Sequence, residues 1–370
     1  MFKGLRIPLI IGMLTAVLGS GCAAPRKVEV SLEEKIGQML MVSFRGLSVD
    51  KNHPVIQDIQ KRHVGAVILF DYDVPGKSPV RNIASPSQVR KLVSDLQAAS
   101  SRPLLVAIDQ EGGKVCRLKE KYGFPPTLSA KQMGRKKPEA TYAAALAMAQ
   151  TLKEAGINLN LAPVVDLNRN RKNPVIGKLG RSFSPDPDRV TDHARQFILA
   201  HHDQGVLCAL KHFPGHGSST SDSHKGFTDV TPTWSPMELQ PYRQLIAEGL
   251  ADTVLTAHVF NANLDPDHPA TLSRSVIAGR LRGELGFDGV VISDDLQMGA
   301  IAQHYDLETT LKNAIDAGVD ILLFANNSSY DEQIASKVVA LVSEMVRKRQ
   351  ISEARIEDSF RRIQRLKAGL

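Results

Sequence analysis

The chain has few cysteines and few aromatic residues. Its 370 residues include three cysteines and one tryptophan, and aromatic side chains make up 5% of the sequence. Cys116 and Cys208 lie within or beside apolar stretches, which favours buried thiols over a disulfide framework. A small fold held together by disulfides is therefore excluded, and a chain of this length can bury a large apolar core.

Motifs that bind metal ions or phosphate groups are also absent from the sequence. It contains no CxxC pair, no HExxH motif and no glycine-rich phosphate loop. His201 and His202 are neighbours on an expected helix, so they point to different faces. Residues 215–217 (GHG) follow an expected strand but do not begin a helix, as a phosphate-binding turn would. We therefore expect neither a bound metal nor a cofactor.

Basic residues outnumber acidic ones without forming a continuous basic run. The formal net charge is +7, while charged residues make up 23% and hydrophobic residues 42% of the chain. These fractions are typical of folded soluble proteins. The basic residues are spread along expected helices, and no basic stretch alternates with aromatic residues, so we do not expect a nucleic-acid partner.

Residues 1–22 have the form of an export signal. Two basic residues precede an apolar run over 7–18, and three small residues lead to Cys22. The run is too short for a membrane-spanning helix. The end of this segment resembles the lipobox of bacterial lipoproteins, in which the cysteine carries the lipid, although Gly19 stands where leucine is usual. We expect an exported protein anchored to a membrane through Cys22; a plain signal peptide or an uncleaved anchor is the alternative.

After a short tether at 23–31, apolar stretches typical of buried parallel strands alternate with longer amphipathic stretches typical of helices. The expected strands are 39–44, 66–70, 104–109, 159–166, 206–212, 253–258, 290–294 and 321–325. The expected helices are 87–99, 139–155, 188–204, 236–249, 275–285, 307–317, 330–347 and 352–366. This alternation predicts a single α/β domain over 32–370, folded as a closed (β/α)8 barrel, with a doubly wound open sheet as the alternative.

Ionisable residues follow several of the expected strands at the point where each strand ends. They are Asp109, Asp166, Lys211, His212, His258, Asp294 and Asp295. One carboxylate after a strand is often only a helix cap. The carboxyl ends of barrel strands, however, meet on one face, and active sites are built there. A ring of such groups on that face predicts an enzyme.

Short motifs along the chain carry a resemblance to one enzyme family. They are DQEGG at 109–113, NPVIG at 173–177 with GRSF at 180–183, KHFPGHG at 211–217 with DSH at 222–224, PATLS at 269–273 and ISDDLQM at 292–298. Together they resemble glycoside hydrolase family 3, in its single-barrel β-N-acetylhexosaminidase branch, over about residues 32–327. The chain departs from that branch in the extra residues 71–80 and in its export signal, since familiar members are cytoplasmic.

The resemblance assigns catalytic roles to residues on two segments. Asp294 matches the nucleophile of a retaining mechanism, which attacks the anomeric carbon and forms a covalent glycosyl-enzyme. His224 matches a loop-borne acid/base, and Asp222 matches the carboxylate that orients it. An imidazole suits this role because it titrates near neutral pH.

Five further residues match positions that hold the sugar. By the resemblance, Asp109 accepts hydrogen bonds from ring hydroxyls, while Arg117, Arg181, Lys211 and His212 donate to hydroxyls and to the N-acetyl carbonyl. We expect exo-hydrolysis of terminal β-linked N-acetylglucosamine, from peptidoglycan fragments or chito-oligosaccharides. The alternatives are a phosphorylase or a β-glucosidase of the same family, and a non-catalytic sugar-binding lipoprotein.

Overall fold

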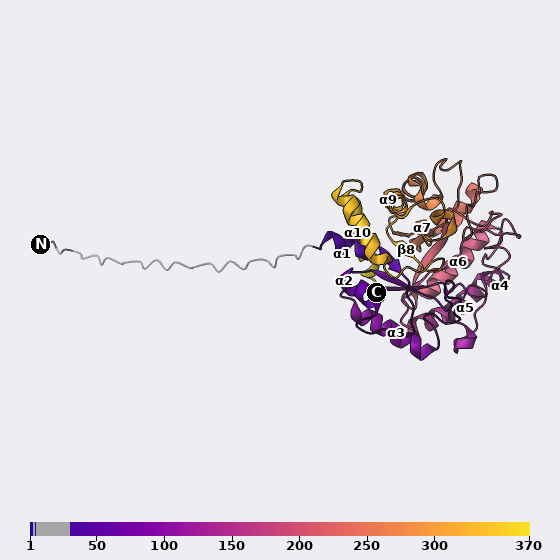
Figure 1. The fold of residues 1–370 in the computed structure, drawn as a ribbon, viewed down its shortest axis with the longest axis horizontal. Helices are drawn as coiled ribbons and strands as arrows, with labels where there is room; N and C mark the ends of the chain where they lie inside the picture. The colour runs from indigo at the N-terminus through magenta and orange to yellow at the C-terminus, as the bar shows by residue number, and fades with distance from the viewer. Residues whose placement is uncertain (3, 5–29) are drawn as a thin grey trace. The chain divides into compact units, whose positions relative to one another are not determined.

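The structure is a computed structural model that describes residues 30–370, together with Met1, Phe2 and Gly4. Cys22 and most of the expected signal peptide and tether lie outside the described residues. Ser31–Leu370 form one unit, which contains every helix and strand that the structure describes. Figure 1 shows this unit with its strands at the centre and its helices around them.

Eight parallel strands form the centre of this unit. They are β1 Leu40–Val42, β2 Ala66–Leu69, β3 Leu105–Ile108, β4 Leu159–Asn160, β5 Leu207–Phe213, β6 Thr253–Thr256, β7 Val290–Ile292 and β8 Leu322–Phe324. Their order in the sheet is β7-β6-β5-β4-β3-β2-β1-β8. A parallel bridge between Ile292 and Ile321, beside β8, joins the two ends of this order. The predicted closed barrel is therefore confirmed, and all eight expected strands are present.

Alternate residues of a strand face the barrel interior and the surrounding helices. In β2, Ile68 lines the central cavity, whereas Val67 and Leu69 pack in a cluster with Val89 of α3 (Pro86–Ala99). Both faces are apolar because both are buried. This is why the strand reads in the sequence as a continuous apolar stretch.

The strand β4 is shorter than the expected stretch 159–166. It covers only Leu159–Asn160, although Val164 still forms a parallel bridge with β5. Pro163 interrupts the ladder because proline has no backbone N–H to donate. The chain runs on beside β5 without regular pairing, and Asp166 then lies within hydrogen-bonding distance of the end of that strand.

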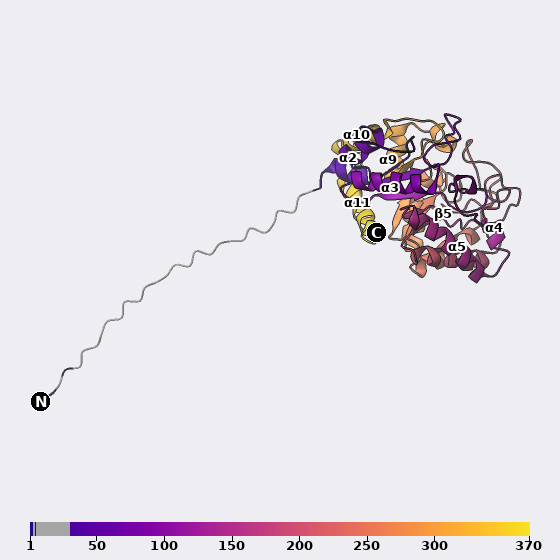
Figure 2. The same cartoon turned by 90° about the horizontal axis from the view of Figure 1, so that it is seen from below.

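Helices cover the outside of the barrel, and Figure 2 shows the same arrangement seen from below. The α-helices are α1 Leu32–Gln38, α2 Pro54–Lys61, α3 Pro86–Ala99, α4 Ala130–Met133, α5 Pro138–Glu154, α6 Pro187–His202, α7 Gln240–Ala247, α8 Gly299–Ala302, α9 Leu307–Ala317, α10 Ile334–Arg347 and α11 Glu353–Lys367. Short 3-10 turns are η1 Glu120–Tyr122, η2 Pro236–Leu239 and η3 Ala270–Leu272, and η4 Ser275–Glu284 is a π-helix.

The expected helices are confirmed, with two differences in their type. The helix expected over 236–249 begins as η2 before continuing as α7, and the one expected over 275–285 is the wider helix η4. Gly156, Gly205 and Gly318 follow the ends of α5, α6 and α9 with positive φ angles of 79°, 71° and 119°, as is common after a helix C-terminus.

Cys116 and Cys208 are both free and buried, and burial raises the pKa of each thiol. Among the described residues, no helix is both long enough and apolar enough to cross a membrane. Nor does the described part of the chain contain a group of three or more histidine, cysteine, aspartate and glutamate side chains that could hold a metal ion.

Candidate active site

A cavity of about 230 Å³ opens at the carboxyl ends of the strands. Apolar side chains of the strands, among them Ile68, Leu255 and Leu323, form part of its wall. The loops that follow β3, β4, β5, β7 and β8 add polar side chains. A cavity of this size, smaller than the roughly 300–1,000 Å³ typical of drug-binding pockets, suits a single small ligand.

Most of the residues singled out in the sequence meet in this cavity. Those that line it are Asp109, Arg117, Arg181, Lys211, His212, His224, Asp294 and Asp295. Asp222 does not line the cavity but hydrogen-bonds to His224. Cys22 lies outside the described residues.

Asp109 is held between two cations. Its Oδ1 lies 2.8 Å from Lys211 Nζ, and its Oδ2 lies 3.2 Å from Arg117 Nη2. Burial alone would raise the pKa of Asp109, but the charges of Lys211 and Arg117 hold it well below its usual value. The carboxylate therefore stays ionised and presents acceptor oxygens to the cavity.

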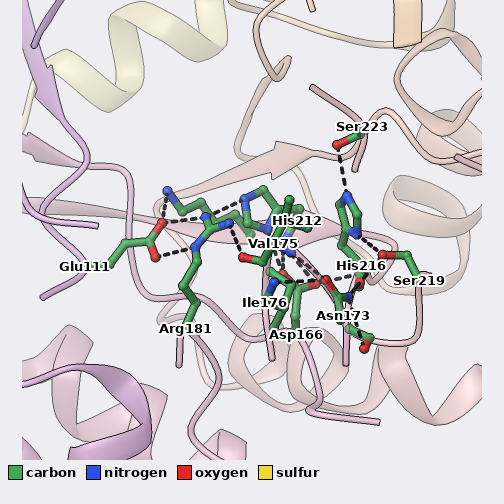
Figure 3. A network of polar contacts seen from close by, with 12 residues as sticks. Glu111, Asp166, Asn173, Val175, Ile176, Arg181, His212, His216, Ser219 and Ser223 are labelled. Carbon is green, nitrogen blue, oxygen red and sulfur yellow. Dashed lines mark hydrogen bonds and ion pairs between the residues drawn. The ribbon is translucent and has the colours of Figure 1, made fainter. Parts of the chain in front are cut away.

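Glu111 anchors the cations from behind. Both of its oxygens lie 2.7 Å from the Arg181 guanidinium, and Oε1 also lies 2.7 Å from Lys211 Nζ. Burial would raise the pKa of Glu111, but Arg181 and Lys211 lower it. Figure 3 shows Glu111 against Arg181. Glu111 does not line the cavity, so its effect is to fix the direction of Arg181 and Lys211, which do.

The ring of His212 is fixed by contacts at both nitrogens. Arg181 Nη2 lies 3.1 Å from His212 Nε2, and a guanidinium can only donate, so Nε2 accepts. Nδ1 then carries the proton and donates to Asp166 Oδ2 at 2.7 Å. His212 therefore turns an acceptor nitrogen, already engaged by Arg181, toward the cavity, which differs from the donor role expected from the resemblance.

Asp294 follows β7 and is only partly buried, so its carboxylate is accessible from the cavity. The backbone N–H of Asp295 donates to its Oδ1 at 2.8 Å. Burial would raise the pKa of Asp294, but His258, His212 and His224 lower it. The side chain is an ionised, accessible carboxylate, as a nucleophile requires.

Asp295 and His258, which lie near Asp294, form hydrogen bonds that hold the surrounding loops. Asp295 Oδ1 accepts backbone N–H groups of Gln297 and Ala325, each at 3.1 Å, and joins the loops after β7 and β8. Burial raises the pKa of Asp295 to about 6. His258 does not line the cavity: its Nδ1 lies 2.8 Å from Thr271 Oγ1 and its Nε2 2.9 Å from the Asp295 carbonyl oxygen.

His224 and Asp222 form a pair on the long loop after β5. His224 Nδ1 lies 2.8 Å from Asp222 Oδ1, and the same oxygen accepts the His224 backbone N–H at 3.0 Å. The imidazole side chain is 60% exposed and the carboxylate 23%. Partial burial would raise the pKa of Asp222, but its hydrogen bonds with His224 lower it. Nδ1 faces Asp222, and Nε2 has no hydrogen-bond partner among the described residues, so Nε2 is the nitrogen available to a ligand.

This loop also forms hydrogen bonds with α8, the short helix that follows Asp294. The backbone N–H groups of Gly299 and Ala300, in α8, donate to the carbonyl oxygens of His224 and Ser223, each at 3.3 Å. An ionised carboxylate and an imidazole thus share one cavity on one face of the barrel. That arrangement can supply a nucleophile and a proton-transfer group to the same bond.

Several cavity residues were not expected from the sequence. Val175 and Leu179 line the cavity from the loop after β4, and Asn327 and Ser328 line it after β8. Val175 lies in the NPVIG motif, which was a usable signal. Asn327 and Ser328 carry no ionisable group, so the pattern of charged strand ends does not include them.

Comparison with known sequences gives close relatives over most of the chain. The family model for the glycosyl hydrolase family 3 N-terminal domain matches residues 31–366. A beta-hexosaminidase of Tolumonas auensis is 37% identical over 293 residues, which cover 78% of this chain and 83% of that protein. A beta-hexosaminidase of Xylella fastidiosa is 36% identical over 306 residues, which cover 80% of this chain and 86% of that protein.

Solved structures are similar over nearly the whole described barrel. A family 3 β-N-acetylglucosaminidase from a Paenibacillus species has a TM-score of 0.84 and 36% identity; the match covers 92% of this chain and 63% of that one. A β-N-acetylhexosaminidase from Beutenbergia cavernae has a TM-score of 0.83 and 32% identity, covering 92% of this chain and 100% of that one. Family model, relatives and barrel agree with the motifs at the strand ends, and the chain belongs to glycosyl hydrolase family 3.

Proposed function

We propose that the protein is a retaining exo-β-N-acetylglucosaminidase. The observation that carries this proposal is that Asp294 and His224 line one cavity together with the cations that fix Asp109. The relatives described above bear hydrolase names, which favours hydrolysis over phosphorolysis. The proposal gives the two catalytic groups distinct roles.

In the first step, Asp294 attacks the anomeric carbon of the bound sugar and forms a glycosyl ester. His224 donates a proton from Nε2 to the oxygen of the leaving group, and Asp222 stabilises the imidazolium. In the second step, the imidazole takes a proton from water, which then attacks the ester. The anomeric configuration is retained because the carbon is inverted twice.

The sugar is held by the charged groups around Asp109. Each carboxylate oxygen of Asp109 already accepts from one cation and has a further lone pair for a ring hydroxyl. Arg117 and Lys211 supply donors, and Glu111 keeps Lys211 and Arg181 in place. Because these groups need no reorganisation when the sugar binds, they favour one orientation of the ring.

Hydrolysis of nitrophenyl β-N-acetylglucosaminide by the purified protein tests this proposal. We expect release of nitrophenol, a strong preference over the corresponding β-glucoside, and no acceleration by inorganic phosphate. A preference for the glucoside would make the protein a β-glucosidase. Formation of a sugar phosphate in the presence of phosphate would make it a phosphorylase.

We further propose that the protein is exported and anchored to a membrane through a lipid on Cys22. At that membrane it would act on peptidoglycan fragments or chito-oligosaccharides. The support is the sequence pattern of residues 1–22. Fractionation of cells that express the native chain and Cys22→Ala tests the anchor. The native chain is expected in the membrane fraction and the variant outside it; equal distribution of both contradicts lipidation.

A further inference from the structure

His216 lies beneath the loop that carries Asp222 and His224. Its ring Nδ1 is 2.8 Å from Ser219 Oγ, and its Nε2 is 3.0 Å from Ser223 Oγ (Figure 3). Ser223 stands between the two members of the acid/base pair. The His216 ring therefore spans the loop from its beginning to the acid/base pair, and it is only 2% exposed.

The contacts of His216 suit a neutral imidazole. Burial lowers its pKa to about 4, so at neutral pH one ring nitrogen donates and the other accepts. The two serine hydroxyls match this pattern because each can donate or accept. Although His216 lines part of the cavity, both of its ring nitrogens are engaged within the loop, so it has no free nitrogen for proton transfer.

The backbone at His216 is itself firmly held. Its N–H donates to Asp166 Oδ1 at 2.7 Å, and its carbonyl oxygen accepts from Asn173 Nδ2 at 2.7 Å. The next backbone N–H, that of Gly217, donates to Glu238 Oε2 at 3.1 Å. The His216 ring is therefore attached to a firmly held backbone and bonds to Ser223 in the more exposed part of the loop.

His224 itself has few contacts. Its ring is 60% exposed, and Asp222, which bonds to it, belongs to the same loop. The backbone bonds from α8 to this part of the loop are long, at 3.3 Å. Among the described residues, the Ser223 hydroxyl connects this pair to the buried ring of His216.

Building on the function proposed above, we propose that His216 and Ser223 form a clamp that positions His224 at the glycosidic oxygen. His216 is a positioning residue in this account, since it acts on the reaction only through the loop. Loss of the clamp removes proton donation while leaving Asp294 and the sugar-binding groups in place.

The variants His216→Asn and Ser223→Ala test the clamp, with His193→Asn as a matched control. His193 in α6 is a fully buried histidine whose Nδ1 lies 2.7 Å from the Thr141 hydroxyl, and it does not line the cavity. Each substitution changes one partner of a hydrogen bond between a buried imidazole and a hydroxyl: the two histidine variants replace the imidazole by a shorter amide, and Ser223→Ala removes the hydroxyl. Only the first two act on the acid/base loop.

The first readout is kcat/KM for two β-N-acetylglucosaminides, one with a dinitrophenyl and one with a phenyl leaving group. Acid catalysis contributes about 10²- to 10⁴-fold, so losing part of it lowers kcat/KM by about tenfold or more for the phenyl glycoside. The dinitrophenyl glycoside needs no proton and is expected to be nearly unaffected. His193→Asn should leave the ratio of the two substrates unchanged. Equal losses on both substrates in the clamp variants would overturn the proposal.

The second readout is hydrogen exchange of the backbone amides in residues 217–225, which does not depend on activity. Exchange is expected to become about fivefold faster in His216→Asn and Ser223→Ala, because losing one hydrogen bond changes an opening equilibrium by about that factor. Exchange should be unchanged in His193→Asn. Unchanged exchange in the clamp variants overturns the clamp. If the native protein cleaves no β-N-acetylglucosaminide, the proposed function fails, while faster exchange still supports the clamp.

Discussion

Replacing Glu238 by glutamine is expected to stabilise the protein, and to do so most at alkaline pH. Glu238 is 1% exposed, and its Oε2 accepts the Gly217 N–H at 3.1 Å. Its Oε1 has no hydrogen-bond partner among the described residues, and no ion pair with a described residue compensates its charge. Burial raises the pKa of Glu238 to about 8, so at neutral pH the carboxyl group is protonated.

The size of the effect follows from the two pKa values. In the unfolded chain the group titrates near its ordinary value of 4.5, and in the folded chain at about 8. The folded state binds one more proton between these values, so its free energy of unfolding falls as pH rises through this window. At about 1.4 kcal/mol per pH unit, the loss is about 3 kcal/mol at pH 7 and about 5 kcal/mol above pH 8. Glutamine resembles the protonated acid and escapes this loss.

Urea denaturation of the native protein and Glu238→Gln, at several values between pH 5 and pH 9, measures the difference. The variant is expected to gain little at pH 5 and about 4 kcal/mol more at pH 9. Glu154→Gln, in which an exposed carboxyl is changed, controls for the loss of one negative charge. If the native protein and Glu238→Gln lose stability in parallel between pH 5 and pH 9, Glu238 does not have a raised pKa in the folded protein.

Two further predictions concern the loop and the sugar site. A Cβ at Gly217 would lie 1.7 Å from the Leu167 carbonyl oxygen, so Gly217→Ala is expected to cost about 1–3 kcal/mol of stability and most of the activity. At Gly226 a Cβ meets nothing closer than 3.4 Å, so Gly226→Ala should be tolerated. Thermal unfolding and hydrolysis assays of both variants measure the difference. Lys211→Met leaves the buried carboxylate of Glu111 and the partly buried carboxylate of Asp109 each short of a partner, and is expected to cost about 3–5 kcal/mol in urea denaturation. A loss below about 1 kcal/mol would contradict the charge network.

The barrel could be predicted from the sequence because its signals are local. Strands buried on both faces read as apolar stretches, and glycines such as Gly318 mark the ends of helices. The early end of β4 was not foreseen, although Pro163 was a visible signal. The π-helix η4 could not be told from an α-helix, since both give a similar amphipathic pattern over ten residues.

The site could be predicted only in part. Charged residues at strand ends are visible in the sequence, and Asp109, Lys211 and Asp294 do line one cavity. Their partners are not visible, because Glu111 and Arg181 are 70 residues apart and meet only in the folded barrel. Ser223 lies in the DSH motif, but the sequence does not show that Ser219 and Ser223 bond to His216, since any polar loop contains hydroxyls.

Trapping the covalent intermediate shows whether Asp294 is the nucleophile in the cavity that it shares with His224. The protein is incubated with a fluorinated N-acetylglucosaminyl donor, digested and examined by mass spectrometry. We expect a glycosylated peptide with the sugar on Asp294. It should be absent in Asp294→Asn and still present in His224→Ala when the donor has a good leaving group. A sugar found on another carboxylate such as Asp109, or no adduct while the donor is turned over, would contradict the role of Asp294 as nucleophile.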